Sequence, residues 1–449
     1  MAAEIEDEPD SGWTRLGQAE LREVLDRHER FIEGRPDGRR ALLAFHDLSN
    51  LDFFRKNLSD ADLTGARLGR ARLTEADLST VNLFTADLRM ANLERCNLTR
   101  ADLRGACLRG ADLSDAVLVN ADMRRAAIAR YDSKGDVKLL EVSQKTAELS
   151  AIVARRADLT GARMADGMAL QADLTDANLR NAQLRGADLR GSILVGAQLE
   201  GADLSGARLA KAEMAGAVLT RAQLAGADLM ETDLRGAILD PEAEKLDEVK
   251  MAIRSKRPTQ AGGKLSEILG RHEEWLSSMG ASGECAMLND ANLAGEILTE
   301  ANLAAARLER SVLCDSDLSR ANLMMASLGF ADLRRAKLVR ADLRGASAAR
   351  CTLIEADLRG ANLAPVERVG KTEQRRGTNL AYAKLGGARL SEAVLRGVAL
   401  VGADLREANL ADADLRGADL RDAVLFGAVL DGASLEGAQL DGARGLKAA

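Results

Sequence analysis

Aromatic residues are scarce in this sequence. Only 2% of its 449 residues are Phe, Trp or Tyr, although these side chains usually supply much of the buried area of a globular core. Smaller residues must therefore fill the interior. Proline is also rare, and all five prolines lie outside the regular part of the sequence that is described below.

Histidine and cysteine are too few and too scattered to suggest a site of chemistry. There are three histidines, and His28 and His272 lie 244 residues apart. The five cysteines are an odd number without CxxC spacing, which argues against a disulfide framework and a zinc site and indicates reduced thiols. The sequence also has no phosphate-binding glycine loop. We therefore predict a protein that is not an enzyme and that has no metal site and no cofactor.

The charge balance gives little reason to expect nucleic acid or membrane partners. The chain has 62 Lys and Arg against 69 Asp and Glu, a net charge of −7, and such a mild value does not indicate a polybasic protein. No stretch approaches the 18 apolar residues of a membrane-spanning helix. The acidic start MAAEIEDEPD has no apolar core and does not resemble a secretory signal. We expect a cytoplasmic protein.

The sequence has instead a repeat of five residues. Four blocks together hold 64 repeats, which cover about 71% of the chain. One position of the repeat is Leu in 57 of them, the position two residues earlier is Ala in 50, and the position between is Asp or Asn in 32. The blocks run from Leu43 to Ile128, from Leu159 to Leu239, from Leu288 to Leu363 and from Leu380 to Leu440.

A period of five excludes an α-helix and indicates a stacked coil. In a helix, successive leucines would spiral around the axis, because five residues advance about 500°. In an extended segment, the Ala and the Leu point to one side and the Asp or Asn between them points to the other. Because five is an odd number, the alternation must break once per repeat, at a corner where Gly and Ser are common. We therefore expect short sides, regular corners and backbone hydrogen bonds between coils.

The pattern A-(D/N)-L-x-x, as in ADLRGACLRGADLSDAVL at residues 101–118, resembles the pentapeptide repeat family. The resemblance implies an all-β solenoid with minor helices, in the form of a right-handed quadrilateral β-helix with four pentapeptides in each coil. The 64 repeats would then make 16 coils.

Interruptions of the repeat indicate a tandem duplication. LREVLDRHERFI at residues 21–32 and LSEILGRHEEWL at residues 265–276 are similar, and each precedes a pair of repeat blocks. Because the second half has its own copy of this segment, we expect two stacks. The expected domains are an N-terminal helical cap (1–40), a first β-helix (41–239) with an insertion at 130–156, a helical linker with a second capping helix (240–284), a second β-helix (285–443) with an insertion at 364–377, and a tail (444–449).

The two similar segments are amphipathic, and two interpretations of them are open. As caps, they would cover the backbone edges and the leucines that an open coil end exposes. As docking helices, they would offer Phe31 or Trp275 to a partner, together with His28 and His272 on the same stripe. A cap predicts that Trp275→Ala destabilises the fold, whereas a docking helix predicts that the variant still folds.

A second candidate contact lies near the C-terminus. Val424, Phe426 and Val429 point outward by their positions in the repeat. Exposed apolar residues can form a contact with another chain. These residues are either isolated on the surface or the contact of a homodimer through the C-terminal end.

Two functions are consistent with these features. The first is a non-enzymatic protein-binding scaffold or adaptor with an unidentified protein partner. The alternative comes from the resemblance, because some pentapeptide repeat proteins bind topoisomerases with a rod shape and an acidic surface. It is a DNA mimic that binds a type II topoisomerase and competes with DNA. The sequence departs from that subgroup, because only Phe53 matches its frequent Phe at the leucine position and because acidic residues alternate with Arg.

Overall fold

A computed structural model of the chain describes residues 13–125, 129–131, 137–139, 147–240, 242–243, 246–250, 252, 264–366 and 376–446. The chain divides into two compact units. The first comprises Met1–Asp233 and Leu239–Ala252, and the second comprises Leu234–Ile238 and Ile253–Ala449. Each unit is described by itself.

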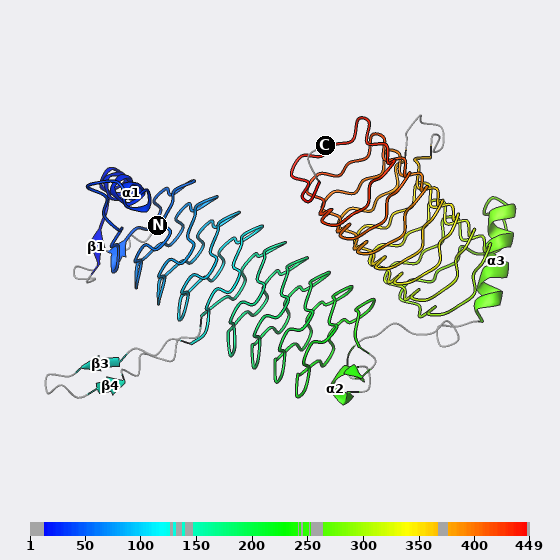
Figure 1. Cartoon of the computed structure of the whole chain (residues 1–449). Helices are drawn as coiled ribbons and strands as arrows, with labels where there is room; N and C mark the ends of the chain where they lie inside the picture. The colour runs from blue at the N-terminus through cyan, green and yellow to red at the C-terminus, as the bar shows by residue number, and fades with distance from the viewer. Residues whose placement is uncertain are drawn as a thin grey trace, which may run out of the picture. The chain divides into compact units, whose positions relative to one another are not determined.

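Each unit contains a stack of coils that parallel backbone pairing holds together (Figure 1). Bridges join residues that are 20 apart, from Leu42↔Asp62 onward in the first unit and from Met287↔Arg307 onward in the second. Twenty residues are four pentapeptides, so each coil has four sides. The pairing confirms the stacked coil that the five-residue period predicts and the four sides that the resemblance implies.

The repeat that begins at Ala61 shows how one side and one corner are built. The N–H of Leu63 donates to the carbonyl of Asn82 in the next coil at 2.8 Å, and the N–H of Asn82 donates to the carbonyl of Ala61 at 3.0 Å. Gly65, with a φ of 63°, is the second central residue of a turn that ends with a bond from the N–H of Ala66 to the carbonyl of Leu63 at 3.0 Å. The same turn recurs along both stacks, often with Arg, Asp or Asn at positive φ.

The Asp or Asn of the repeat supports the corner that follows it. The Oδ1 atom of Asp62 accepts the N–H of Thr64 at 3.1 Å, and the same contact recurs at Asn57, Asp77 and Asn97. These side chains form Asx turns, a role for which Asp and Asn are the usual residues. This explains why the position between Ala and Leu is so often one of the two.

The interior consists almost entirely of the repeated Ala and Leu. Both side chains are buried in nearly every coil, and Phe53 is the largest fully buried side chain. Charged residues at the Ala position lie where water reaches them: Lys56 is half-buried and Glu296 is exposed. The scarcity of aromatic residues follows from this geometry, because a narrow coil with four short sides has room for small and medium side chains.

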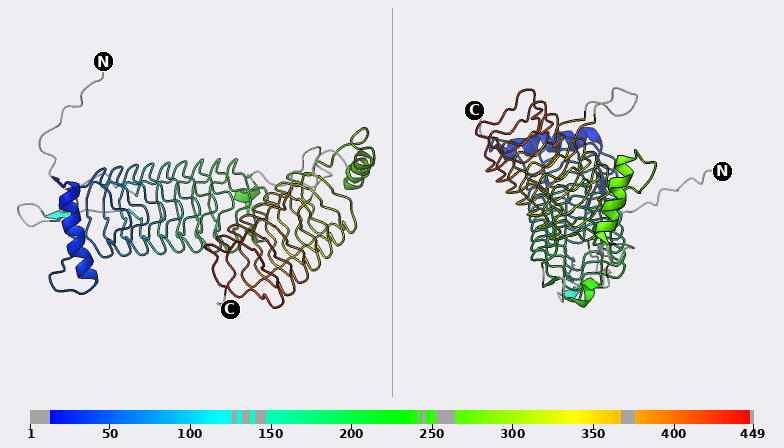
Figure 2. Two further views of the ribbon diagram at one scale, coloured as in Figure 1. Left: turned by 90° about the horizontal axis from the view of Figure 1, so that it is seen from above. Right: turned by 90° about the vertical axis from the view of Figure 1, so that its right-hand side faces the viewer.

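A few elements lie outside the coils. Helix α1 (Gln18–Ile32) and helix α3 (Leu265–Ser277) match the two similar segments of the sequence. Figure 2 shows α1 across the N-terminal end of the first stack. The other elements are β1 (Thr14–Arg15), β3 (Ala129–Tyr131), β4 (Val137–Leu139) and α2 (Asp247–Lys250). Strand β2 (His46–Asp47) is itself part of the first coil, where Asp47 pairs with Arg67.

Both insertions interrupt the repeat in the sequence, but each stack continues on either side of its insertion. Cys107 pairs with Glu148, which is 41 residues later, and Ser347 pairs with Asn379, which is 32 residues later. Relative to the usual spacing of 20, the two coils therefore contain 21 and 12 extra residues. The antiparallel pair β3–β4 belongs to the first insertion.

The expected extent of the first insertion, 130–156, is wrong at its C-terminal end. Residues 147–156 already form part of a coil, because Leu149 is buried and Val153 pairs with Asp112. The repeat is hidden in the sequence because Ile152 and Ala154 stand where Ala and Leu are usual. Both side chains are buried. They therefore point inward like the usual Ala and Leu, although their sizes are exchanged.

The register predicts that the first insertion is dispensable for folding. Deleting residues 126–146 joins Arg125 to Ala147, which restores the 20-residue spacing between Cys107 and Glu148. We expect the shortened chain to keep its β-structure and a thermal midpoint within a few degrees of the full chain.

Circular dichroism with a thermal melt measures both quantities. The matched control deletes residues 126–145, one residue fewer. It shifts the phase of the repeat by one residue and should lower the midpoint, because a shift of one turns inward side chains outward. Unfolding of the 126–146 deletion itself would contradict the register.

Candidate interaction surfaces

The N-terminal end of the first stack is closed by the residues that precede it. β1 pairs in parallel with β2, and the N–H of Thr14 donates to the carbonyl of Phe45 at 3.2 Å. The side-chain amide of Gln18 replaces a missing strand at Asp52, because Nε2 donates to the carbonyl and Oε1 accepts the N–H of that residue, both at 2.9 Å. Open strand edges therefore receive hydrogen-bond partners from the same chain.

The two similar helices make the same buried contact at the start of each stack. The Nδ1 atom of His28 in α1 accepts the N–H of Ala41 at 3.1 Å, and the Nδ1 atom of His272 in α3 accepts the N–H of Ala286 at 3.0 Å. Both imidazoles have 0% of their surface exposed. Each alanine begins the first repeat of its stack, so the histidines satisfy backbone groups that the stacks leave open.

These contacts correct part of the predicted docking surface. His28 and His272 are buried under their helices and are out of reach of a partner. Phe31 and Trp275 stack on them, with ring centroids 6.0 and 5.7 Å apart. Phe31 is exposed and Trp275 is half-buried, so each aromatic ring packs on its histidine and keeps part of its surface in solvent.

Burial lowers the pKa of both histidines below the usual value of 6.5. An imidazole whose Nδ1 atom accepts a hydrogen bond holds its proton on Nε2 and is neutral. A second proton would have to replace the bond to the backbone N–H and would place a charge in a dry site.

Carboxylates close the C-terminal end of the first stack. The Oε1 atom of Glu248 in α2 accepts the N–H of Gly226 at 2.9 Å, and the carboxylate of Asp240 accepts the N–H of Arg221. Val249 of the same helix is fully buried. The segment that was expected as a helical linker thus contributes a cap to the first unit.

The last coil of the second stack is more open. Its leucines, Leu430, Leu435 and Leu440, are only partly buried, whereas Leu425 in the coil before them is 1% exposed. No helix follows this coil within residues 376–446. Of the predicted contact patch, Phe426 is 55% exposed and Val429 is 42% exposed. Val424 is half-buried.

Many acidic side chains on the sides of the stacks are paired with arginines of the same chain. In the sequence Asp-Leu-Arg, the carboxylate accepts both the N–H and the guanidinium of the arginine, as in Asp102 with Arg104 at 3.2 and 2.6 Å. The same unit recurs along both stacks as Asp87 with Arg89, Asp122 with Arg124, Asp188 with Arg190, Asp332 with Arg334, Asp342 with Arg344, Asp357 with Arg359, Asp404 with Arg406, Asp414 with Arg416 and Asp419 with Arg421.

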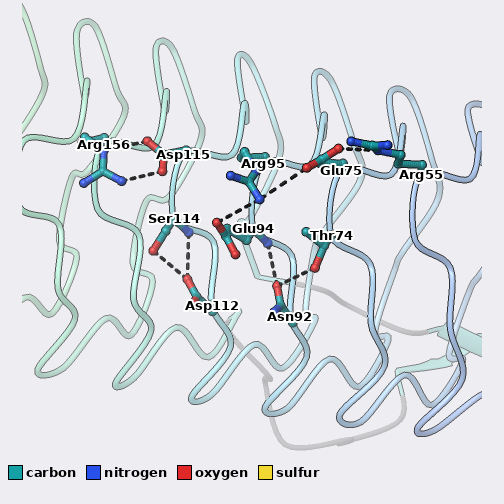
Figure 3. A network of polar contacts seen from close by, with 10 residues as sticks. All are labelled: Arg55, Thr74, Glu75, Asn92, Glu94, Arg95, Asp112, Ser114, Asp115 and Arg156. Carbon is teal, nitrogen blue, oxygen red and sulfur yellow. Dashed lines mark hydrogen bonds and ion pairs between the residues drawn. The ribbon is translucent and has the colours of Figure 1, made fainter. Parts of the chain in front are cut away.

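Charges also pair along the corners, from one coil to the next (Figure 3). Arg55 and Arg95 bind Glu75 from both sides at 2.6 and 3.3 Å, and Arg156 binds Asp115 further along the same corner. The surface is therefore rich in charge, and many of its acidic groups have a basic neighbour on the same or an adjacent coil. Single exposed pairs of this kind contribute little stability, about 0–1 kcal/mol each.

The metal-ligating residue types are scattered over the part of the chain that the structure describes. Within that part, no group of three or more His, Cys, Asp or Glu is placed to hold a metal ion. Burial raises the pKa of the Cys96 and Cys351 thiols to about 12, so they are protonated and weakly nucleophilic at neutral pH. In the same part of the chain, no helix is long and apolar enough to span a bilayer.

A comparison with protein families gives one match, to the family described as pentapeptide repeats (8 copies). The matched residues are 47–128, 157–236, 297–363 and 376–444, more than half of the chain. No curated protein is significantly similar to the chain.

Several solved structures are similar to the chain. HetL, a pentapeptide repeat protein involved in heterocyst differentiation regulation in the cyanobacterium Nostoc, is 27% identical over 66% of this chain and 89% of its own, with a TM-score of 0.17. QnrB1, a plasmid-mediated fluoroquinolone resistance protein, is 20% identical over 48% of this chain and 99% of its own, with a TM-score of 0.22. Rfr23 from the cyanobacterium Cyanothece is 25% identical over 31% of this chain and 88% of its own, with a TM-score of 0.17.

The buried histidines predict a stability that depends on pH. Because the pKa of each is lower in the folded chain than in the unfolded chain, the unfolded state binds more protons below about pH 6.5. The contribution of the histidines is therefore complete above pH 6.5 and is lost as the pH falls toward their lowered pKa.

Urea unfolding between pH 7.5 and 5 measures this effect. The double variant His28→Asn/His272→Asn should be less stable at pH 7.5 and should lose less stability than the wild type as the pH falls to 5. His46→Asn is the control, because that histidine lies in β2, outside the helices α1 and α3, and its side chain is half-buried. Equal losses in the wild type and the double variant would contradict the assignment.

Proposed function

Because the chain belongs to the pentapeptide repeat family, we propose that it is a non-enzymatic scaffold or adaptor that binds another protein along its β-helical stacks. The observation that carries the proposal is the unbroken register of each stack. Pairing continues from Leu42 to Asp233 and from Met287 to Arg444 across both insertions. Side chains on the sides of such a stack lie at fixed spacings, which favours binding of a partner without loss of conformational entropy.

The arrangement of chain ends supports two separate stacks as the working parts. Each stack begins under its own helix, α1 or α3, and the first also ends under α2. In this proposal, the first right-handed quadrilateral β-helix occupies 41–239 and the second occupies 285–443, with the segment between them as a linker and caps.

The alternative, a DNA mimic that competes for a type II topoisomerase, has less support. A mimic needs a surface of unpaired negative charge that resembles the phosphates of a duplex. Here the Asp-Leu-Arg units and the corner pairs place arginines beside many of the carboxylates, so the negative charge is interrupted along the stacks. The net charge of −7 over 449 residues is correspondingly small.

Affinity capture from the source cells, with mild crosslinking and mass spectrometry, tests the scaffold. We expect one protein at stoichiometric yield.

The variants Trp275→Ala and Phe31→Ala separate the two interpretations of the helices. Capping predicts a lower thermal midpoint, whereas docking predicts an unchanged midpoint and loss of the partner.

The class of protein that is captured decides between the two functions. A topoisomerase subunit as the main captured protein would favour the mimic. No stoichiometric partner under crosslinking would contradict the scaffold.

We also propose that the C-terminal patch joins two copies of the chain. Phe426 and Val429 are exposed next to a coil whose leucines are only partly buried, so a second copy would remove apolar surface from water.

Phe426→Asp should convert a dimer to a monomer in analytical ultracentrifugation. Ile297→Asp, at an exposed residue far along the same stack, should not. A monomeric wild type at high micromolar concentration would contradict the dimer.

A further inference from the structure

A notch of about 560 Å³ lies on one corner of the second stack. It is formed by turn residues of successive coils and has three arginines in its lining. The lining residues are Thr299, Ser319, Arg320, Val339, Arg340, Arg359, Gly360, Ser391 and Glu392.

The notch is hollow because glycine interrupts a column of side chains. Along this corner, the second turn residue is Arg320, then Arg340, then Gly360 in successive coils. Gly360 has a φ of +64°, and a Cβ atom built on it would lie 3.4 Å from Cγ of Arg340. The stem of Arg340 therefore lies beside the space that a side chain at Gly360 would fill.

Arg340 has no acidic neighbour on the adjacent coils, in contrast to the two other arginines of the notch. Arg320 binds Glu300 at 3.2 Å, and Arg359 binds Asp357 at 2.8 Å. Arg340 is exposed, and it forms no ion pair with the part of the chain that the structure describes. One coil away on either side are Arg320 and Gly360, so the usual alternation of charge along a corner fails here.

We propose that this notch binds a short acidic segment of a protein partner, with a carboxylate of that segment on the guanidinium of Arg340. This inference rests on the scaffold function proposed above and names the chemistry of its partner. Guanidinium and carboxylate form paired hydrogen bonds of fixed geometry. Ser391 lines the same notch and carries a further hydroxyl donor, whereas the hydroxyl of Ser319 binds the carboxylate of Asp317.

Charges around the notch limit the length of what can bind. Glu300 precedes Arg320 on this corner, and Glu392 and Asp412 follow Gly360. A long polyanion such as a DNA duplex would meet these carboxylates on both sides of the arginines. A segment with one or two acidic side chains is short enough to contact Arg340 between Glu300 on one side and Glu392 on the other.

The binding test uses the full chain and a fluorescein-labelled peptide with two adjacent glutamates among glycines and serines. Fluorescence anisotropy at 50 mM salt measures the affinity, because surface charges are screened at higher salt. We expect Arg340→Gln to weaken binding about fivefold or more. Arg100→Gln is the matched control: it removes an exposed arginine from the same turn position of the first stack and should change nothing.

A second pair of variants changes the shape of the notch and keeps its charge. Gly360→Asn fills the hollow with a residue that tolerates positive φ, and we expect it to weaken binding of the peptide. Gly417→Asn adds the same side chain at a φ of +64° where nothing lies within 4 Å of the new Cβ, and it should leave binding unchanged. Thermal melts of all four variants verify that they are folded.

The outcomes separate this proposal from the scaffold on which it rests. Three results would contradict binding of an acidic segment at the notch. They are equal binding by Arg340→Gln and Arg100→Gln, tighter binding of a glutamine version of the peptide, and preference for a DNA duplex. If Arg340→Gln and the wild type capture the same partner from cells with equal yield, the proposal for the notch is wrong and the scaffold function stands. Absence of any partner for the wild-type chain would instead remove the scaffold.

Discussion

Parallel backbone pairing between coils is the interaction on which the rest of this structure depends. It gives every interior coil two neighbours, one on each side, and it leaves unpaired N–H and carbonyl groups at each end of a stack. Several different groups of the chain supply hydrogen bonds to these ends. They are the short strand β1, which pairs with β2, the amide of Gln18, two histidines and the carboxylate of Glu248. Helices at the ends are thus a consequence of the pairing.

The same pairing accounts for the surface. A spacing of 20 residues places every corner side chain next to those one coil before and after. Opposite charges on adjacent coils therefore meet, as in Arg55, Glu75 and Arg95. At Arg340, no acidic side chain lies at the same corner of an adjacent coil, so pairing between coils does not explain why an arginine is present. Such a residue is a candidate for contact with another molecule, because local rules are broken most often at functional sites.

The buried histidines show how a duplicated element can be identified by function as well as by sequence. His28 and His272 lie in segments that differ at many positions, yet each accepts the first N–H of its own stack at nearly the same distance. The shared task explains why a polar residue stands on an otherwise apolar stripe. An apolar side chain there would leave a backbone N–H without a partner, which costs about 1–3 kcal/mol.

The sequence by itself determined the stacked coil, the inward Ala and Leu and the exposure of Phe426 and Val429, because a strict period fixes which way each side chain points. The two helices followed from the amphipathic segments before the repeats, and the four sides of each coil followed from the resemblance to the family. The sequence did not reveal that residues 147–156 belong to a coil, since Ile152 and Ala154 hide the pattern. It also left His28 and His272 open between a cap and a docking surface. Only the tertiary structure buried them, because burial and pairing across 20 or more residues depend on which coils and helices become neighbours in space. The notch at Gly360 exists for the same reason.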